Sequence, residues 1–393
     1  MVSQDDVTRN SSLNIIYLCN MAGIYIHIPF CKQACTYCDF HFSTTFDKYR
    51  SALIDAIIVE LEQRKEYLNS ESIETIYFGG GTPSLLTEKE LDLLLSRIYS
   101  IYEVTDIAEI TLEANPDDIL IDRLQEWKKL GVNRLSIGLQ SFLQSDLDWM
   151  NRAHTAEESE NAVKLAKEFG FSLTVDLIYG LPDRTLEEWK VNIEKLISLA
   201  PSHISAYCLT IEEKTVLSKW IEKGKIDPAS EDEQAEQFLL LVRVLEKAGY
   251  QQYEISNFAK EGKYSKHNSN YWKGVSYLGV GPSAHSFNGE SRRWNVSNNR
   301  KYINGVTNGV EFSDSEILTP KDRFNETVMT GLRTIWGVNL EVLRWHHCTN
   351  KLFDNRLEEF KNEKLLTVES NHIVLTKKGK LQADYIASEL FLD

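Results

Sequence analysis

Residues 25–42 read YIHIPFCKQACTYCDFHF and hold three of the chain's six cysteines. Cys31, Cys35 and Cys38 are spaced C-x3-C-x2-C, and three thiolates this close together suit an iron–sulfur cluster or a soft metal ion. The apolar run 23–28 precedes them and ends at Pro29. This pattern predicts a strand that leads into a cysteine-bearing loop.

The number of thiols narrows the interpretation. A [4Fe–4S] cube takes four ligands, and the nearest candidate position for a fourth, two residues after Cys38, is Phe40. We therefore predict a three-cysteine cluster with one iron left open to a group that is not protein. A zinc site is the alternative, but structural zinc normally needs a second close pair of ligands, and Cys19, Cys208 and Cys348 are scattered singly. A disulfide is disfavoured, because three close cysteines cannot pair off.

Length and composition set broad limits. The 393 residues predict one large domain and a smaller one. The formal net charge of −15 argues against a general binder of nucleic acid or of anionic membranes. No run approaches the roughly 18 apolar residues of a membrane span. The first twenty residues make a poor signal peptide, so we expect residues 1–22 to be an N-terminal extension that need not be ordered, and the protein to be cytoplasmic.

The first two-thirds of the chain alternates strand-like and helix-like segments. Strands are predicted at 23–28, 75–78, 109–112, 134–138, 173–178 and 203–209. Helices are predicted at 48–67, 88–101, 119–130, 156–169 and 186–199. Six β–α units in a row predict a parallel sheet that closes partly or wholly into a barrel. The expected fold is α/β, a partial (β/α)6 TIM-like barrel over residues 23–255.

Polar residues gather where the predicted strands end, which is where barrels of this kind place their chemistry. The cysteine loop follows the first strand, and the run GGGTP at 79–83 follows the second. Glu113 and Asn115 follow the third strand, Gln140 follows the fourth with Arg152 beyond it, and Asp176 lies in the fifth. This convergence predicts a site at one mouth of the barrel.

The periodicity changes after residue 208. A helix is predicted at 231–248, an extended piece at 253–258, a polar and aromatic loop at 266–272 and a glycine-rich stretch at 279–283. From residue 320 the pattern is helices, then strands at 365–369 and 373–375 around a turn at 370–371, then a helix at 378–391. We expect residues 256–319 to be a connecting segment and residues 320–393 to be a small α+β domain resembling a winged helix.

Several residues have both a functional and a plain structural interpretation. Gly80 and Gly81, followed by Thr82, let the backbone approach a ligand, although a tight turn would use glycine too. Four polar side chains suit ribose hydroxyls, an amino group and a carboxylate, or alternatively ordinary salt bridges and caps: Glu113, Gln140, Arg152 and Asp176. The rings of Tyr25 and Tyr37 could pack on adenine or shield the cluster.

The run HNSNYW at 267–272 offers a candidate haem site. Imidazole is the usual proximal ligand of haem iron, so His267 is a candidate axial ligand, although most lone loop histidines are simply solvated. Tyr271 and Trp272 could cover a flat macrocycle, or fill the space between the domains.

With the cysteine loop after strand one and GGGTP after strand two, the chain resembles radical S-adenosylmethionine enzymes. The segments YIHIPFC, YFGGGTPS, LEANP, SIGLQSF, NRAH and DLIYGLP resemble those of the oxygen-independent coproporphyrinogen III oxidase family, from about residue 23 to the C-terminus. The resemblance implies that Cys31, Cys35 and Cys38 hold a [4Fe–4S] cluster and that S-adenosylmethionine occupies its open iron. It further implies a set of S-adenosylmethionine contacts: Tyr25, Tyr37, Gly80, Gly81, Thr82, Glu113, Gln140, Arg152 and Asp176. A second S-adenosylmethionine, as in the oxidase, would lie near Gly81, Thr82, Gln140, Arg152 and Asp176.

Two departures from the oxidase pattern point to a subgroup. The oxidase has a further cysteine where this chain has Phe40, and a longer N-terminal segment that contacts substrate. HNSNYW instead resembles the H-N-x-x-Y-W pattern of the HemW subgroup, whose members are regarded as haem chaperones for respiratory acceptors. The resemblance therefore implies that His267, with Tyr271 and Trp272, forms the haem site.

The sequence thus predicts a cytoplasmic haem chaperone that carries a [4Fe–4S] cluster and S-adenosylmethionine and holds haem as cargo. Its expected partners are haem, an unidentified acceptor protein and an electron donor to the cluster, with peripheral association with a membrane-bound acceptor as a further expectation. An enzyme that oxidises coproporphyrinogen III is the first alternative. A nucleic-acid regulator using the C-terminal domain is the second, and the acidic net charge disfavours it.

Overall fold

The computed structural model describes residues 21–345 and 351–392. Nearly all of the expected N-terminal extension lies outside these residues, and its last two positions, Met21 and Ala22, belong to the first strand, β1 (Met21–Ile28). Within the described ranges no helix is long and apolar enough to cross a membrane.

Each of the six predicted parallel strands is present, usually longer than expected. They are β1, β2 (Ser72–Gly80), β3 (Val104–Ala114), β4 (Arg134–Gln140), β5 (Ser172–Tyr179) and β6 (His203–Cys208). Gly79, Gly80, Glu113 and Gln140, which we expected just after strands, therefore lie in the last residues of strands. The prediction stopped too early because glycine and polar residues interrupt the apolar pattern, whereas pairing with neighbouring strands continues through them.

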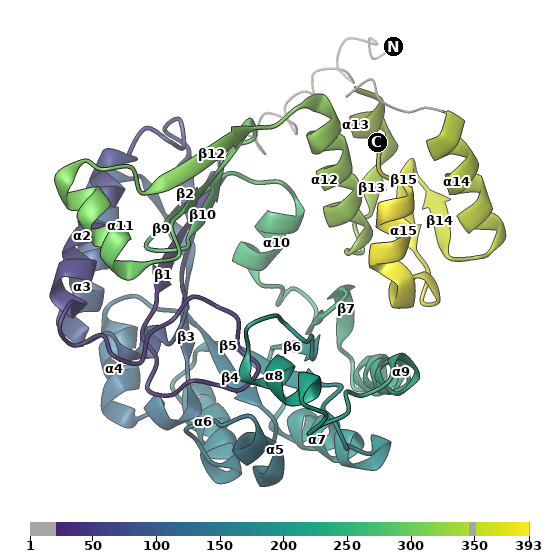
Figure 1. Cartoon of the computed structure of the whole chain (residues 1–393), viewed down its shortest axis with the longest axis horizontal. Helices are drawn as coiled ribbons and strands as arrows, with labels where there is room; N and C mark the ends of the chain where they lie inside the picture. The colour runs from purple at the N-terminus through teal and green to yellow at the C-terminus, as the bar shows by residue number, and fades with distance from the viewer. Residues whose placement is uncertain (1–20, 346–350, 393) are drawn as a thin grey trace, which may run out of the picture.

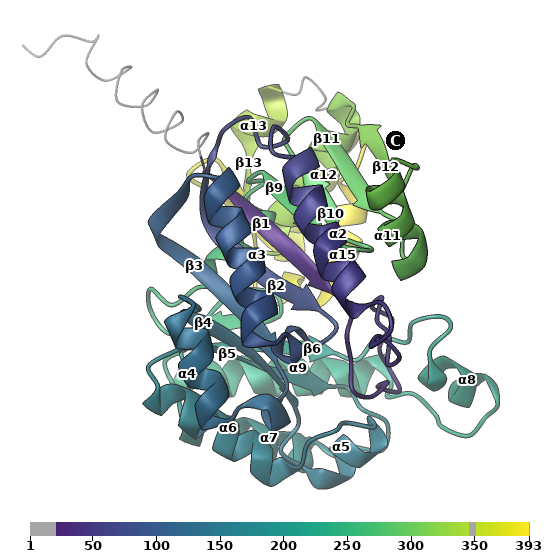
Figure 2. The ribbon, with the colours of Figure 1, turned by 90° about the vertical axis from the view of Figure 1, so that its left-hand side faces the viewer.

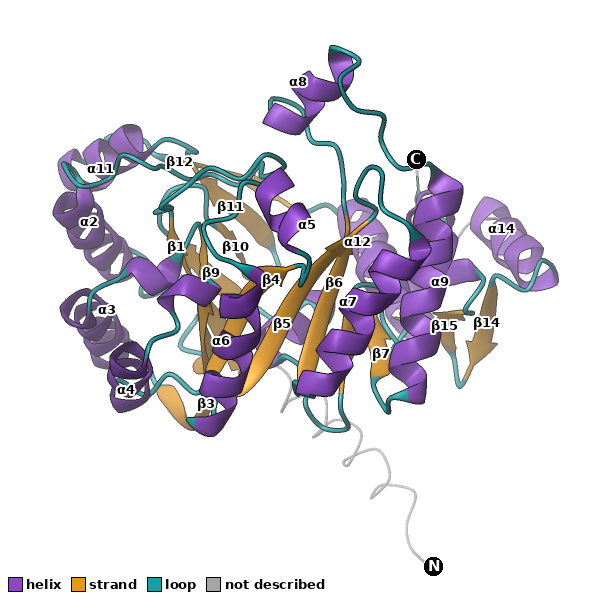
Figure 3. Cartoon of the chain, turned by 90° about the horizontal axis from the view of Figure 1, so that it is seen from below, coloured by secondary structure: helices purple, strands orange, loops and turns teal. Residues whose placement is uncertain are grey.

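The helices between these strands follow the prediction closely. They are α2 (Arg50–Gln63), α3 (Glu88–Ile101), α4 (Ile121–Lys129), α6 (Ala156–Glu168) and α7 (Leu186–Leu199). Capping boxes at Thr87, Thr155 and Thr185 begin three of them. A short helix, α5 (Gln144–Trp149), was not expected. Figures 2 and 3 show these helices covering the outer face of the sheet, with α2–α4 on one flank and α6 and α7 on the other.

Parallel pairing runs without interruption from β1 to β6, and further strands extend the sheet on both sides. Beyond β1 the order is β9 (Tyr277–Val280), β10 (His285–Phe287), β11 (Ser291–Asn295) and β12 (Ser313–Ile317). Beyond β6 it is β8 (Asn257–Ala259) and β7 (Gln251–Glu254), which lie antiparallel to their neighbours. The sheet ends at β12 and β7, so the barrel is partial and its concave side faces α10 (Figure 1).

The segment after β6 corrects two expectations. The extended piece at 253–258 is a hairpin of β7 and β8, because the Glu254 carboxylate accepts the Ser256 N–H (2.9 Å) and the Asn257 side chain (2.6 Å) and so turns the chain. The loop expected at 266–272 is helix α10 (Lys266–Trp272). Ser265 caps it, and the Glu109 carboxylate of β3 accepts the N–H groups of its first two residues. The sequence did not show this tertiary contact.

Three more helices complete the barrel region. They are α8 (Val216–Glu222), α9 (Glu231–Lys247) and α11 (Asn299–Asn308). Of these only α9 was predicted, one residue longer than it is. Helix α8 projects from the end of the barrel where the parallel strands finish (Figure 3).

The C-terminal region packs around its own hydrophobic cluster, which includes Phe324, Leu343 and Ile386. Its elements are α12 (Pro320–Leu332), β13 (Val338–Asn339), α13 (Leu340–Trp345), α14 (Lys351–Asn362), β14 (Leu366–Glu369), β15 (His372–Leu375), a 3-10 turn (Gly379–Gln382) and α15 (Ala383–Glu389). The three strands form a small antiparallel sheet in the order β13-β15-β14. The helix expected at 378–391 is shorter, because its first turn is 3-10 and α15 begins only at Ala383.

Candidate cluster site and adjoining cavity

The cysteine loop is tied down at its base, where it leaves β1. The Cys31 N–H donates to the Ser43 carbonyl (3.1 Å), and the Ser43 N–H donates to the Pro29 carbonyl (2.7 Å). Cys31, Cys35 and Cys38 are free thiols, each partly buried. A closed base of this kind restricts the positions that the three sulfurs can take.

Two other elements hold the middle of the loop. The Thr36 N–H donates to the Met150 carbonyl (3.1 Å) just after α5, and the Thr36 carbonyl accepts the Leu217 N–H (2.9 Å) of α8. The Asn151 side chain donates to the Ala34 carbonyl (2.7 Å). The unexpected helices α5 and α8 therefore support the segment between the second and third cysteines.

The electrostatics of the thiols fit a cluster site. Burial raises the pKa of Cys31, and burial together with the other two thiols raises the pKa of Cys38 to about 12. The three sulfur atoms are thus close enough to repel one another as thiolates, and a bound cation would relieve that repulsion. Within residues 21–345 and 351–392 no three His, Cys, Asp or Glu side chains are arranged to hold a single metal ion. In an iron–sulfur cube each thiolate would bind its own iron.

Gly80, the last residue of β2, and Gly81 after it allow the chain to pack closely against β1 and the start of the cysteine loop. Gly80 has φ +109°, and a Cβ there would lie 2.5 Å from the His27 ring. A Cβ on Gly81 would lie 2.7 Å from the Phe30 carbonyl oxygen. The Thr82 hydroxyl then donates to Cys31 Sγ at 3.5 Å. The glycines therefore allow β2 to end directly beside the loop.

Two partly buried carboxyl groups lie on β3 and β5, on either side of β4. Glu113 accepts the Tyr77 hydroxyl (2.8 Å) and the Gly80 N–H (3.2 Å), and burial, with a contribution from Asp176, raises its pKa to about 7. Asp176 accepts the Ser136 hydroxyl (3.2 Å), and burial raises its pKa to about 6. A cationic group bound nearby would favour the charged form of both carboxyls.

Arg152 and Gln140 lie next to Gly138 of β4, and Arg152 also contacts the second cysteine. The Arg152 guanidinium donates to Cys35 Sγ (3.4 Å), to the Asn115 side chain (2.7 Å) and to the Gly138 carbonyl (2.9 Å). Its Nε is buried and has no partner. Gln140 has φ +68°, and its amide lies over Gly138. Tyr37 packs on the small apolar cluster that includes Leu147.

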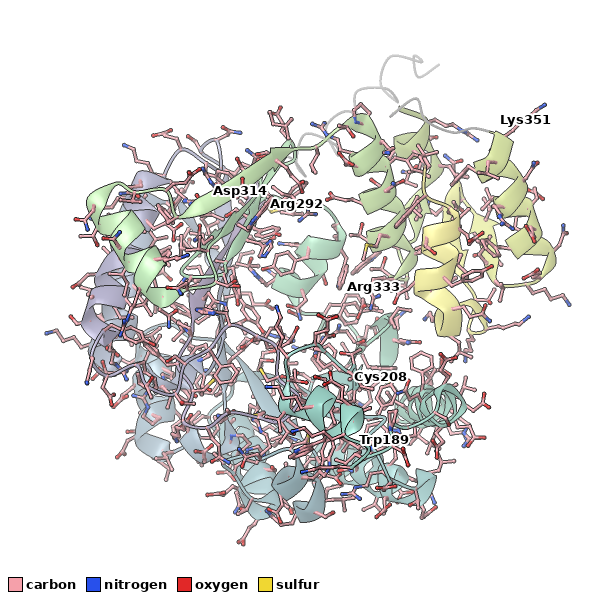
Figure 4. All side chains as sticks on the ribbon, viewed as in Figure 1. Trp189, Cys208, Arg292, Asp314, Arg333 and Lys351 are labelled. Atoms are coloured by element: carbon pink, nitrogen blue, oxygen red, sulfur yellow. The ribbon has the colours of Figure 1, made fainter. Side chains whose placement is uncertain are left out.

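A cavity of about 360 Å³ adjoins this site. It lies between the sheet, α10 and the start of the C-terminal region, where Figure 4 labels Arg333. Its lining consists of Tyr25, Tyr77, Glu113, Tyr207, Glu254, Ser256, Asn257, His267, Asn268, Tyr271, Trp272 and Arg333. This volume is within the range of small-molecule sites in proteins.

His267 lines the cavity, but both of its ring nitrogens already have partners. Nδ1 is hydrogen-bonded to the Thr75 hydroxyl (2.8 Å) and Nε2 to the Tyr271 hydroxyl (2.7 Å). The ring stacks on Tyr77 with a centroid distance of 4.9 Å, and only 2% of the residue is exposed. Burial lowers its pKa to about 3, so the imidazole is neutral. The plain alternative of a solvated loop histidine is therefore wrong.

The structure divides the expected residues into two groups. Tyr25 and Glu113 share the cavity with His267, Tyr271 and Trp272, whereas the other expected S-adenosylmethionine contacts are not among its lining residues. Sequence reasoning missed Tyr77, although Tyr25 and Tyr77 are register partners on β1 and β2 and their alternation with apolar residues could have indicated it. No sequence pattern indicated that Glu254 and Arg333 would line the cavity. They come together only in the folded chain, through an antiparallel bridge between Glu254 and Thr334.

Family models match both parts of this architecture. Residues 25–196 match the Radical SAM superfamily, and residues 318–381 match the HemN C-terminal domain. The solved structure of Escherichia coli coproporphyrinogen III oxidase (HemN) superposes with a TM-score of 0.82 over 96% of this chain and 93% of that one, at 22% identity. The fold is therefore that of a radical SAM protein with a HemN-like C-terminal domain.

Curated relatives narrow the class further. The chain is 34% identical over 370 residues to the heme chaperone HemW of Bacillus subtilis, covering 92% of this chain and 97% of that protein. It is 35% identical over 391 residues to the heme chaperone HemW of Haemophilus influenzae, covering 94% and 97%. This chain belongs to the HemW family of radical SAM proteins, which confirms the resemblance inferred from its motifs.

Proposed function

We propose that this protein is a haem chaperone, which binds haem and delivers it to an acceptor protein while carrying a [4Fe–4S] cluster and S-adenosylmethionine. The observation that carries the proposal is an aromatic cavity whose wall includes Glu113, the residue that accepts the Gly80 N–H at the end of β2, in a chain that matches HemW chaperones over nearly their whole length. We also propose that the protein is cytoplasmic. Because it is acidic, we propose no nucleic-acid partner.

Cys31, Cys35 and Cys38 would hold the cluster. With S-adenosylmethionine on its open iron, such a cluster supplies one-electron chemistry that can cleave the sulfonium C–S bond. The protein's own residues hold the thiols in place, and Phe40, which is 67% exposed, supplies no fourth sulfur. An external electron donor would be needed to reduce the cluster.

The S-adenosylmethionine contacts remain those expected from the family. Gly80, Gly81 and Thr82 form the segment beside Cys31. The unpartnered Nε of Arg152 could donate to the carboxylate of S-adenosylmethionine. The partly buried carboxyls Glu113 and Asp176 suit an amino group. Gln140, Tyr25 and Tyr37 complete the set.

Haem would occupy the cavity against the rings of Tyr271 and Trp272. His267 Nε2 could bind haem iron only after its hydrogen bond to the Tyr271 hydroxyl breaks. Tyr271 would therefore compete with the iron for this nitrogen. Arg333 lies 5.3 Å from the Trp272 ring and is held by Glu254 (3.1 Å), which places a cation on the cavity wall where a propionate could reach it.

The decisive experiment is anaerobic reconstitution with iron and sulfide, followed by a haem titration with and without S-adenosylmethionine. We expect a [4Fe–4S] cluster and one saturable haem site per chain. The same preparation is then incubated with coproporphyrinogen III, S-adenosylmethionine and reductant. Formation of protoporphyrinogen IX would replace the chaperone proposal with the oxidase alternative, and zinc in place of iron would overturn both.

A further inference from the structure

Asn115 connects two residues that touch cysteine sulfurs. It lies immediately after β3, one residue beyond Ala114, at the end of the sheet where the cysteine loop is found. Its Oδ1 accepts from Arg152 Nη2 at 2.7 Å, and its Nδ2 donates to the Thr82 hydroxyl at 3.5 Å. It does not line the cavity. Asn115 is therefore placed to act through its two neighbours.

Both neighbours donate to a thiol. The Thr82 hydroxyl reaches Cys31 Sγ (3.5 Å), and Arg152 Nη1 reaches Cys35 Sγ (3.4 Å). The third sulfur, on Cys38, receives a backbone hydrogen bond from Phe40 within the loop itself. Two of the three sulfurs thus depend on side chains that Asn115 holds, and the third does not.

Hydrogen bonds to ligand sulfurs are one of the main determinants of the potential of an iron–sulfur cluster. A donor stabilises the extra negative charge of the reduced cluster, so its loss makes the cluster harder to reduce. Partners of the ligands commonly change the properties of a metal site by tenfold or more when they are mutated.

We propose that Asn115 is a positioning residue that orients the Thr82 and Arg152 donors towards Cys31 and Cys35 and thereby raises the reduction potential of the cluster. The inference rests on the proposed cluster. It gives Arg152 a role in addition to the proposed contact with S-adenosylmethionine, because its Nη1 donates to Cys35 Sγ.

The test is the midpoint potential of the reconstituted cluster in Asn115→Ala, measured without S-adenosylmethionine. We expect a more negative potential, equivalent to about tenfold in the one-electron reduction equilibrium, or about 59 mV. Thr82→Val removes only the donor to Cys31 and should give part of the shift. It also keeps the proposal testable if Asn115→Ala fails to load a cluster.

Asn133→Ala is the matched control. Asn133 also bridges neighbouring segments, by accepting the Ile110 N–H (3.0 Å) and donating to the Ala108 carbonyl (2.8 Å), but it lies just before β4, at the opposite end of the sheet. We expect it to lower stability and leave the potential unchanged.

A double-mutant cycle completes the test. In a Thr82→Val/Arg152→Gln background, Asn115→Ala should cause no further shift, because both of its intermediaries are gone. An unchanged potential in Asn115→Ala, or an equal shift in Asn133→Ala, would overturn the inference while leaving the chaperone proposal intact. Failure of the unaltered protein to assemble any cluster would instead overturn the proposed function.

Discussion

The cysteine loop and helix α10 both carry candidate ligand atoms, and the surrounding protein treats those atoms differently. Each of the three thiols receives a hydrogen bond, and all three remain free and partly exposed. The imidazole of His267 is buried, stacked and hydrogen-bonded at both nitrogens. The loop is prepared to take a cofactor, whereas α10 must break a hydrogen bond before His267 can ligate anything.

The largest effect is expected from removing all three thiols of the cysteine loop, which should leave α10 unaltered. Changing Cys31, Cys35 and Cys38 together to alanine should abolish iron and sulfide binding, because no other ligand set is available in the loop. The fold should survive, since none of the three side chains is fully buried. Iron and sulfide content per chain measures the effect, and Cys208→Ala is the control that should keep the cluster. Iron retained in the triple variant would contradict the assignment.

Variants of α10 test whether His267 binds haem. His267→Ala should weaken haem binding by about tenfold or more and lower the free energy of unfolding by about 1–3 kcal/mol, because the Thr75 and Tyr271 hydroxyls lose their partner. Tyr271→Phe removes only the hydroxyl on Nε2 and should bind haem at least as tightly as the unaltered protein. Haem titrations followed by absorbance measure both. An equal loss of haem affinity in the two variants would indicate that His267 forms part of the cavity wall and does not bind the iron.

Glu113 gives a smaller effect, which depends on pH. Its pKa is raised from 4.5 to about 7 by burial, so its contribution to stability is fully present below about pH 4.5 and is lost as the pH rises through 7. The ligand-free protein should lose about 2 kcal/mol of unfolding free energy from this group between pH 5 and pH 8. Urea unfolding at both values should show a weaker pH dependence in Glu113→Gln. Asp176, raised to about 6, should supply the part that remains.

Phe40 should give the smallest effect. At 67% exposure, its replacement by serine should change stability by less than about 0.5 kcal/mol. The cluster content should also stay the same, because a ring in solvent supplies no ligand. Phe40→Cys, compared with Phe40→Ser, asks whether a fourth thiol at this position competes for the open iron. A large loss of iron in the serine variant would show that the ring shields the cluster.

Much of the fold was readable from the order of apolar and capped segments. The strands and helices up to residue 208 and the C-terminal hairpin follow local patterns, such as the Thr87 and Thr185 capping boxes. Helix α10 was read as a loop because the carboxylate that stabilises its first turn, on Glu109, comes from β3. Helix α5 was missed because it is only one and a half turns long, too short for a periodic pattern.

Local spacing along the chain was enough to identify the three thiols, the glycines beside them and the family, because these features depend on neighbours within a few residues. Only the folded chain placed Arg333 and Glu254 on the cavity wall, used both nitrogens of His267, and set Asn115 between Thr82 and Arg152. Apart from the contact between His267 and Tyr271, which lie four residues apart on α10, these contacts join residues from 33 to 192 positions apart. The burial of these side chains and their hydrogen-bond partners are decided by tertiary packing, which cannot be inferred from a short stretch of sequence.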